Sequence, residues 1–432
     1  MFGQSSMSFK RDRDVIVAGA GPAGAVAAYA LARAGRRVLI VERFTLPRQK
    51  PCGGGISTRV LTRFPWLREP LGRIPTHPVS SLYLEGPSRG VFRMQSSGPA
   101  VILIRRIEFD FLLATLAQEA GAEILSPAAI AQASQDADGV TLRTRDGREL
   151  RAPIVIAADG VNSVIARRLG MNPGWPPERL ALDMMEETPT ALLRTAEPDT
   201  LSVFYGYGGA HGYAYIFPKR EHVNVGIGYV LPYFKQRVEL TPYDLQQQFV
   251  GDLRARGLMD GSSRREHFTP FLIPIGGPLS TTASGRVLLA GDAGGFVNGF
   301  SAEGIYYAMV TGELAAKAVL ESPSPAAMRR AYVRAWRHEI GAELRDSVLI
   351  QKYLFSSPAR MDRVVSGANA RPEFSRILVD YASGRLTYRA ARRRLLWYFP
   401  RLLPRLVRIA LERKTNDSRT LNPEARATNP EP

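Results

Sequence analysis

The chain has 432 residues, 45% of them hydrophobic and 22% charged, as in a globular protein with one large core or two linked ones. A single cysteine and five scattered histidines exclude an internal disulfide, argue against a metal site, and favour a reducing compartment such as the cytoplasm. The formal net charge of +17 leaves nucleic acid, an anionic membrane surface or acidic small molecules as possible partners.

The opening segment MFGQSSMSFKRDRD contains no apolar stretch of signal-peptide length. No later apolar run reaches the ~20 residues that span a bilayer. We therefore expect neither export nor a transmembrane helix.

Residues 14–42 have the pattern of a strand, a glycine turn, a helix of small residues and a second strand that ends at Glu42. The turn fits the dinucleotide fingerprint GxGxxG, whose glycines permit a tight turn, backbone approach to a pyrophosphate and close helix packing. Its residues are Gly19, Gly21, Pro22, Ala23 and Gly24. Glu42 stands at the usual distance for an acid that binds ribose hydroxyls, and an acid there disfavours NADP.

Residues 171–275 are rich in aromatic residues, prolines and alternating segments, which favours a β-rich domain inserted into the first. We predict an α/β protein whose Rossmann-type FAD-binding domain is discontinuous, with a β-rich substrate domain and a C-terminal helical region. The expected FAD-binding pieces are 12–75, 100–170 and 276–320, and the β-rich pieces are 76–99 and 171–275. A basic helical region, 321–414, and a disordered tail, 415–432, follow.

The segment GRVLLAGD returns a strand that ends at Asp292, about 270 residues after the fingerprint. A carboxylate at a strand end, followed by a loop and a helix, suits the ribityl hydroxyls of FAD, which NAD lacks. A helix N-cap is the structural alternative for Asp292. The two distant segments together favour FAD as the ligand.

Six segments in chain order carry a resemblance to a known family: GAGPAGAVAA, PRQKPCGGGIS, RRIEFDFLL, ADGVNSVIARRLG, YAYIFPK and GDAGGFVNGFSAEGIYYAM. Together they resemble the geranylgeranyl reductase family of FAD-dependent oxidoreductases, which has the para-hydroxybenzoate hydroxylase-like fold. The resemblance covers residues 14 to about 320.

The resemblance implies a set of residues around FAD. Arg106 would contact the cofactor, Asp159 would help to close the nucleotide site, and Asp292 would bind the ribityl chain. Backbone N–H groups of Gly304 and Ile305 would face the isoalloxazine at a helix start, where the helix dipole favours the negative charge of reduced flavin. The remaining cofactor contacts would come from Cys52, Gly53 and Gly54.

The same resemblance places PCGGGIS along the substrate side of the flavin, where glycines let the backbone lie close to a flat ring. Cys52 would be a small wall near the reacting carbon and a possible proton donor, and a structural thiol is the alternative. Tyr213 and Tyr215 are further candidate proton donors. They would form an aromatic wall for a hydrocarbon chain, together with Phe217 and Pro218, unless this is an ordinary core face.

Two segments depart from the family pattern, at three positions. Tyr215 stands where tryptophan is usual, which weakens any inference about substrate size. Gly299 replaces a frequent proline and Ala302 the first glycine of GEG, so the loop at the flavin edge could have another shape.

The resemblance implies reduction of the C=C bonds of a geranylgeranyl or other polyprenyl chain by hydride from reduced flavin. The substrate could be a lipid, a quinone or a chlorophyll-type molecule. An FAD-dependent monooxygenase acting on an aromatic or polyene substrate, and a membrane-associated electron carrier, are the alternatives. The chain has no second GxGxxG, so NADPH, NADH and ferredoxin all remain possible transient electron donors.

Residues 385–414 interleave arginines with Leu, Trp, Tyr and Phe and contain one acid, Glu412. Short amphipathic pieces of this composition bind anionic lipid surfaces. We expect a peripheral protein on the inner face of the membrane and no binding to nucleic acid. A solvated basic face of a helical cap is the alternative.

Overall fold

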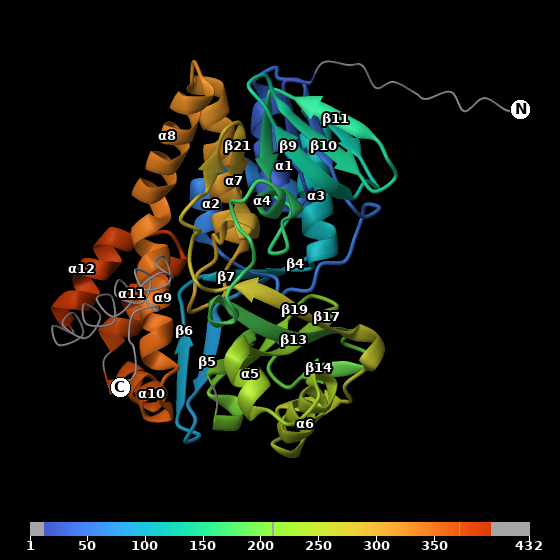
Figure 1. The fold of residues 1–432 in the computed structure, drawn as a ribbon. Helices are drawn as coiled ribbons and strands as arrows, with labels where there is room; N and C mark the ends of the chain where they lie inside the picture. Colours follow the sequence, from blue (N-terminus) through green and yellow to red (C-terminus); the bar gives the residue numbers. More distant parts are fainter. Residues whose placement is uncertain (1–12, 210, 371, 399–432) are drawn as a thin grey trace, which may run out of the picture.

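The computed structural model describes residues 13–209, 211–370 and 372–398. The expected α/β class is confirmed: a mainly parallel sheet and a larger, mainly antiparallel sheet lie one above the other, and helices run along one side of both (Figure 1). The expected tail, 415–432, and the basic segment from 399 to 414 lie outside the described residues.

The first sheet has the order β20-β21-β12-β1-β2-β8, and every pair except β20–β21 is parallel. Its four inner strands, β21, β12, β1 and β2, are apolar and almost entirely buried because layers cover both faces. Its bounds are β1 Val15–Ala18, β2 Val38–Val41, β8 Glu123–Leu125, β12 Ile154–Ala157, β20 Ala283–Ser284 and β21 Val287–Leu289.

Alternate residues of β1 enter two different cores. Val15 and Val17 pack in the core that contains the helices α1 (Pro22–Arg33), α3 (Arg106–Glu119) and α7 (Ile305–Glu321). Ile16 and Ala18 pack on the other face, against a three-stranded antiparallel sheet and a short helix. These elements are β9 Ile130–Gln135, β10 Val140–Thr144, β11 Glu149–Ala152 and α4 Val164–Arg168. This layering is the Rossmann-type arrangement that the sequence predicts.

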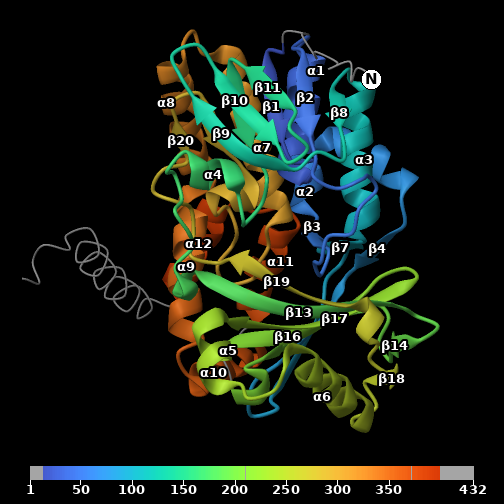
Figure 2. The same cartoon turned by 45° about the vertical axis from the view of Figure 1, so that its right-hand side comes forward.

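The second sheet has the order β19-β13-β17-β16-β15-β5-β6 (Figure 2). One face packs against α6, whose Leu245, Phe249 and Leu253 share a core with strand residues such as Ile227. The bounds of the strands are β5 Ser81–Glu85, β6 Val91–Gln95, β13 Leu180–Pro189, β15 Thr200–Tyr205, β16 Gly212–Pro218, β17 His222–Val230 and β19 Phe268–Pro274. The covering elements are α5 Leu231–Arg237, α6 Pro242–Ala255, β14 Leu193–Thr195 and β18 Met259–Gly261.

A small sheet of order β3-β7-β4 joins the two larger units, because β7 leads into α3 and β4 leads into β5. Its bounds are β3 Gly55–Ser57, β4 Thr76–Val79 and β7 Val101–Ile104, and α2 is Arg59–Arg63. The short 3₁₀ turns are η1 Pro65–Leu67, η2 Pro70–Arg73, η3 Pro177–Arg179, η4 Tyr207–Gly209, η5 Arg265–His267 and η6 Gly291–Gly294.

The C-terminal helices form a column beside both large sheets (Figures 1 and 2). At one end Tyr332 of α8 donates to the Leu289 carbonyl at 2.5 Å, and at the other Asn369 of α10 donates to the Val91 carbonyl at 2.8 Å. In the described parts of the chain we find no helix long and apolar enough to cross a bilayer. The bounds are α8 Pro325–Trp336, a π turn Arg337–Gly341, α9 Ala342–Leu354, α10 Pro358–Ala370, α11 Pro372–Ala382 and α12 Tyr388–Tyr398.

Helix α1 packs very closely on its neighbours. A Cβ added at Gly24 would lie 1.9 Å from the Gly19 carbonyl oxygen, and one added at Gly312 of α7 would lie 2.1 Å from the Ala23 carbonyl oxygen. Both distances are far below van der Waals contact, and both obstacles are backbone atoms that have no rotamer to change. Glycine is therefore required at these two positions.

We expect Gly312→Ala to lower the free energy of unfolding by about 1–3 kcal/mol, because the added methyl must push α1 away from α7. The measurement is chemical denaturation. Gly251→Ala is the matched control, since Gly251 lies on the exposed side of α6 with nothing within 4 Å of an added Cβ. The control should keep or slightly raise stability because alanine is the better helix former. Equal stabilities of the two variants would contradict the packing argument.

Candidate active site

A cavity of about 620 Å³ lies between the parallel sheet and the seven-stranded sheet. All but two of the residues that the sequence predicts for cofactor and substrate line it. They are Gly19, Gly21, Pro22, Ala23, Glu42, Cys52, Gly53, Gly54, Arg106, Asp159, Tyr213, Tyr215, Phe217, Asp292, Gly304 and Ile305. Gly24 lies behind the turn in α1, and Pro218 is buried at the end of β16, where it pairs with Val223.

The glycine turn at the start of α1 forms one end of the cavity. Gly19 has φ +100°, and a Cβ there would lie 2.4 Å from the Ala158 carbonyl oxygen. Gly21, the N-cap of α1, has no side chain to block the helix N-terminus. Free N–H groups and the helix dipole make such an end a binding site for a phosphate.

Glu42 is 3% exposed at the end of β2. Its carboxylate accepts hydrogen bonds from the backbone N–H of Ala20 at 2.8 Å and of Phe44 at 3.1 Å, and Arg48 Nε lies 3.4 Å away. These contacts fix the carboxylate beside the glycine turn. Each oxygen keeps lone-pair capacity, so the group can also accept bonds from ribose hydroxyls.

Asp110 of α3 holds two arginines at the cavity wall. It binds Arg106 through two oxygens at 2.7 and 2.8 Å, and Arg48 at 3.0 Å. Burial alone would lower the pKa of the Arg106 guanidinium, but the Asp110 carboxylate and the Cys52 thiol raise it above its usual value. Arg106 is therefore a fixed cation in the wall, and it contacts Cys52.

The loop that carries Cys52 lies flat between the two large sheets. The Gly54 N–H donates to Cys52 Sγ at 3.4 Å, and Gly54 has φ +74°. A Cβ at Gly54 would lie 2.1 Å from the Ile104 carbonyl oxygen, and one at Gly53 would lie 2.8 Å from the Phe217 ring. Glycine is required at both positions because backbone fills one side and an aromatic ring the other.

Tyr213, Tyr215 and Phe217 form a row of rings on one face of β16. The centroids of Tyr213 and Tyr215 are 6.2 Å apart, and those of Tyr215 and Phe217 are 4.7 Å apart. The hydroxyl of Tyr213 donates to the Ser301 carbonyl at 2.8 Å, which ties the row to the loop before α7. This row is the aromatic wall of the cavity.

The neighbouring strand β17 leaves room for these rings. Gly226 pairs with Tyr215 and Gly228 with Tyr213. A Cβ at Gly226 would lie 2.5 Å from the hydroxyl oxygen of Tyr215. Because β17 has no side chain there, the Tyr215 ring crosses it and its hydroxyl reaches Asp183 on β13, at 3.1 Å from Oδ2.

Two further carboxylates line the cavity. Asp159 accepts backbone N–H groups of Val164 at 2.9 Å and Ile165 at 3.3 Å through Oδ2. Its Oδ1 is buried with no hydrogen-bond partner among the described residues, and burial raises the pKa of this carboxyl. Asp292 lies in η6, and a Cβ at Gly304, the N-cap of α7, would come within 3.5 Å of its Oδ1.

The loop before α7 holds Ala302 at φ +55°, a left-handed conformation that costs an L-residue roughly 1–2 kcal/mol. The side chain of Asn298 shapes this loop by accepting the N–H groups of Phe300 and Ser301, both at 3.0 Å. The Ala302 N–H donates to the Asn298 carbonyl at 2.9 Å. Ala302, which stands where the family usually has glycine, is thus held in a left-handed backbone conformation that glycine adopts more easily.

Arg59 is a buried cation that joins this loop to the C-terminal helices. It binds Glu303 at 2.9 Å, Glu343 of α9 at 3.0 Å and the hydroxyl of Tyr381 of α11. Ser57 donates to the second oxygen of Glu303 at 2.8 Å. Since Glu303 lines the cavity, this cluster connects the cavity to α9 and α11.

Among the charged residues of the site that sequence reasoning missed are Lys50, Asp183 and Glu303. Asp183 left a signal, because it is an acid on a buried strand of otherwise mostly apolar residues, LALDMM. Lys50 directly precedes PCGGG. Glu303 directly precedes the predicted helix start at Gly304, and its partner Arg59 is 244 positions away.

Comparison with known proteins identifies the class first. Residues 12–310 match the family model described as FAD binding domain, so the chain is an FAD-binding protein of this class. The digeranylgeranylglycerophospholipid reductase 2 of Methanothermobacter thermautotrophicus is 31% identical over 356 residues, covering 79% of this chain and 87% of that protein. A menaquinone reductase of Mycobacterium tuberculosis is 32% identical over 330 residues, covering 72% and 77%.

Among solved structures, a geranylgeranyl bacteriochlorophyll reductase-like protein from Thermoplasma acidophilum has the same fold. Its TM-score is 0.77 at 21% identity, with 92% of this chain and 99% of that chain covered. The chain belongs to the geranylgeranyl reductase family of FAD-dependent oxidoreductases. The resemblance seen in the sequence is confirmed.

The residues present fit FAD. The two glycines at the start of α1 leave an open helix N-terminus, and the unpaired Oδ1 of Asp159 gives the cavity a buried acceptor that a bound donor group would satisfy. Carboxylates at Glu42 and Asp292 lie at two separate strand ends of the sheet, as a long ligand with two sets of hydroxyls requires. FAD is the cofactor that this set of groups suits.

We expect Gly226→Ala to destabilise the protein by about 1–3 kcal/mol and to displace the Tyr215 ring, because the new methyl would overlap its hydroxyl. Thermal denaturation measures the first effect and tyrosine fluorescence or NMR the second.

Gly228→Ala is the matched control on the same strand, since the nearest atom to its added Cβ is 3.7 Å away, an ordinary contact. A Gly226→Ala protein as stable as Gly228→Ala would contradict the account of how Tyr215 crosses β17.

Proposed function

We propose that this protein saturates C=C bonds of a geranylgeranyl or other polyprenyl chain. The observation that carries the proposal is the aromatic wall of Tyr213, Tyr215 and Phe217, which packs against the glycine loop of Cys52 in the same cavity as the cofactor groups. Such a surface binds an apolar hydrocarbon chain, which has no hydrogen-bonding groups. The names of the relatives, reductases of geranylgeranyl lipid and of menaquinone, support the same substrate class.

Reduced FAD supplies the hydride when it is bound. The groups that would hold FAD are the N-terminus of α1, Glu42 and Asp292, with Arg106 as a fixed positive charge in the wall. The rings of Tyr215 and Phe217 would position the alkene and exclude water. The electron donor, NADPH, NADH or ferredoxin, stays a prediction.

The polyprenyl proposal is tested by product mass under anaerobic conditions. Protein reduced with dithionite and mixed with geranylgeranyl diphosphate or a digeranylgeranyl phospholipid should yield products heavier by two hydrogens for each bond reduced. Protein without reductant is the control. A product that gains oxygen, or turnover that requires oxygen, would instead identify the monooxygenase that the sequence left open.

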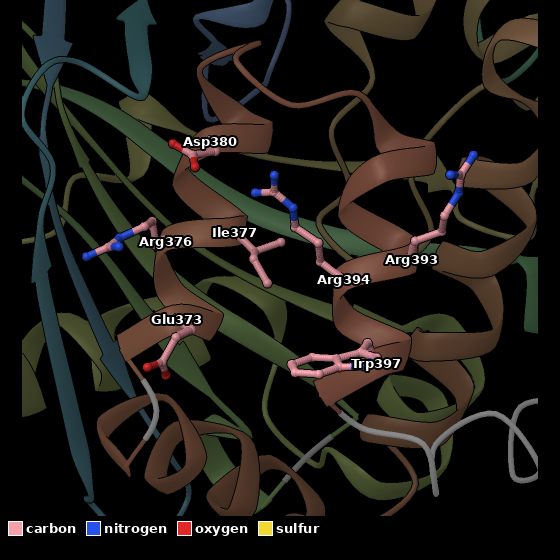
Figure 3. Close-up of a pocket in the computed structure, with 7 residues that line it drawn as sticks. All are labelled: Glu373, Arg376, Ile377, Asp380, Arg393, Arg394 and Trp397. Atoms are coloured by element: carbon pink, nitrogen blue, oxygen red, sulfur yellow. The ribbon is translucent and has the colours of Figure 1, made fainter.

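We further propose that the surface of α11 and α12 binds an anionic membrane from which the substrate enters. Figure 3 shows Arg394 and Trp397 pointing from α12 toward α11, with Arg393 on the other side of α12. Trp397 is 76% exposed and Leu378 of α11 38%. Exposed arginines beside an exposed tryptophan suit the lipid headgroup region.

The variant Arg393→Glu/Arg394→Glu of the full chain should bind vesicles containing anionic lipid more weakly, by about 30-fold or more, since each basic residue contributes about 1 kcal/mol near such a surface. Co-sedimentation is the measurement. The matched control is Arg330→Glu/Arg334→Glu, two exposed arginines of α8 with the same change of charge. Equal loss of binding in both variants would show that net charge, and not this surface, governs attraction.

A further inference from the structure

Asp183 is a carboxyl group buried in the wall of the cavity and is 5% exposed. It lies on β13 between Gly228 of β17 and Phe271 of β19, which pair with it on either side. Within the described residues its hydrogen-bond partner is Tyr215, whose hydroxyl is 3.1 Å from Oδ2 and 3.4 Å from Oδ1. No ion pair to it occurs in that part of the chain, and a buried carboxyl without one favours its neutral form.

Asp183 lines the cavity itself and also contacts a second lining residue, Tyr215. Tyr215 also lines the cavity, and its ring lies next to Gly53, where an added Cβ would be 3.6 Å from the ring. Asp183 is thus in hydrogen-bond contact with a tyrosine whose ring lies beside the loop of Cys52. Because Gly226 has no side chain, β17 does not block the contact between Tyr215 and Asp183.

The charges around Asp183 keep its proton labile near neutral pH. Burial raises the pKa of Asp183 to about 7, while the Tyr215 hydrogen bond and the positive charge of Lys50 lower it. The Lys50 ammonium lies 4.6 Å from the centroid of the Phe271 ring.

The titratable groups near the pair of Asp183 and Tyr215 are Lys50, from the loop before β3, and Tyr213, from β16. Cys52 interacts electrostatically with the two tyrosines. The strands on either side of β13 place Gly228 and Phe271 there, which do not titrate.

The other candidate donors are held by other partners. Tyr213 donates its hydroxyl hydrogen to the Ser301 carbonyl at 2.8 Å. The Cys52 thiol contacts the Arg106 guanidinium and accepts the Gly54 N–H at 3.4 Å. Of the three candidate donors, Cys52, Tyr213 and Tyr215, Tyr215 is the one whose hydroxyl is hydrogen-bonded to a buried carboxyl group.

We propose that Asp183 is the acid of the reaction and that Tyr215 transfers the proton to the double bond, an inference that rests on the proposed function. One alkene carbon takes the hydride, and the other takes the hydroxyl proton of Tyr215, so that the π electron pair becomes a C–H bond. Tyr215 takes the proton of Asp183 at the same time. The resulting carboxylate, stabilised by Lys50, is protonated again from water.

The protonation of Asp183 is tested without turnover. Difference infrared spectroscopy of the protein, with and without FAD, should show a carboxylic acid carbonyl band that disappears as the pH rises through about 7. Asp183→Asn should lose this band. Glu186→Gln is the matched control: Glu186 is a buried acid on the same strand whose carboxylate binds Gln246 of α6. A titrating band that persists in Asp183→Asn would overturn the proposal.

The role in the reaction is tested by single turnover of reduced protein with a polyprenyl substrate. The wild-type rate should fall above about pH 7, because the acid must be protonated to act. Asp183→Asn should react about 100-fold or more slowly and lose this pH dependence. Tyr215→Phe should also be slow but keep the infrared band of Asp183, whereas folded Glu186→Gln should keep the wild-type rate and pH profile.

Two failures are distinguishable. Wild-type protein that reduces no polyprenyl substrate overturns the proposed function, and the role of Asp183 with it. Wild-type protein that reduces the substrate beside an equally fast Asp183→Asn, with an unchanged pH profile, overturns only the assignment of the acid.

Discussion

The close approach of α1 to the backbone on two sides is the constraint on which the rest of the structure depends. Gly24 lets the helix rest on the turn that precedes it, and Gly312 lets α7 rest on the helix. The N-termini of α1 and α7 both line the cavity, so the distance between the two helices sets the spacing of these two helix ends. A single methyl group in this contact would move both helix ends together.

The aromatic wall on the second sheet also depends on positions that have no side chain. Missing side chains at Gly53 and Gly54 bring a backbone loop against the aromatic wall, and missing side chains on β17 let a tyrosine ring cross a whole strand. The wall therefore combines apolar rings with one buried acid, Asp183, which also lines the cavity.

The sequence was sufficient for features that are local in the chain. The fingerprint, the acid at the end of β2 and the alternation of Tyr213, Tyr215 and Phe217 each follow from one segment, and the structure places them at one cavity. The contact of Tyr215 with Asp183 could not be predicted, because it depends on the register of three strands, β13, β17 and β16. Nor does spacing reveal that Gly226 is the position that opens the route between them.

Arg59 connects the C-terminal helices to a cavity that the described residues of these helices do not line. Its guanidinium is shared by Glu303, Glu343 and the hydroxyl of Tyr381, so α11 cannot shift without breaking a contact of the loop at the helix start. A shift of α11 would therefore act on a buried cation, and that cation holds the carboxylate of Glu303 in place. The packing of α11 and the position of Glu303 at the cavity are thus linked through one side chain.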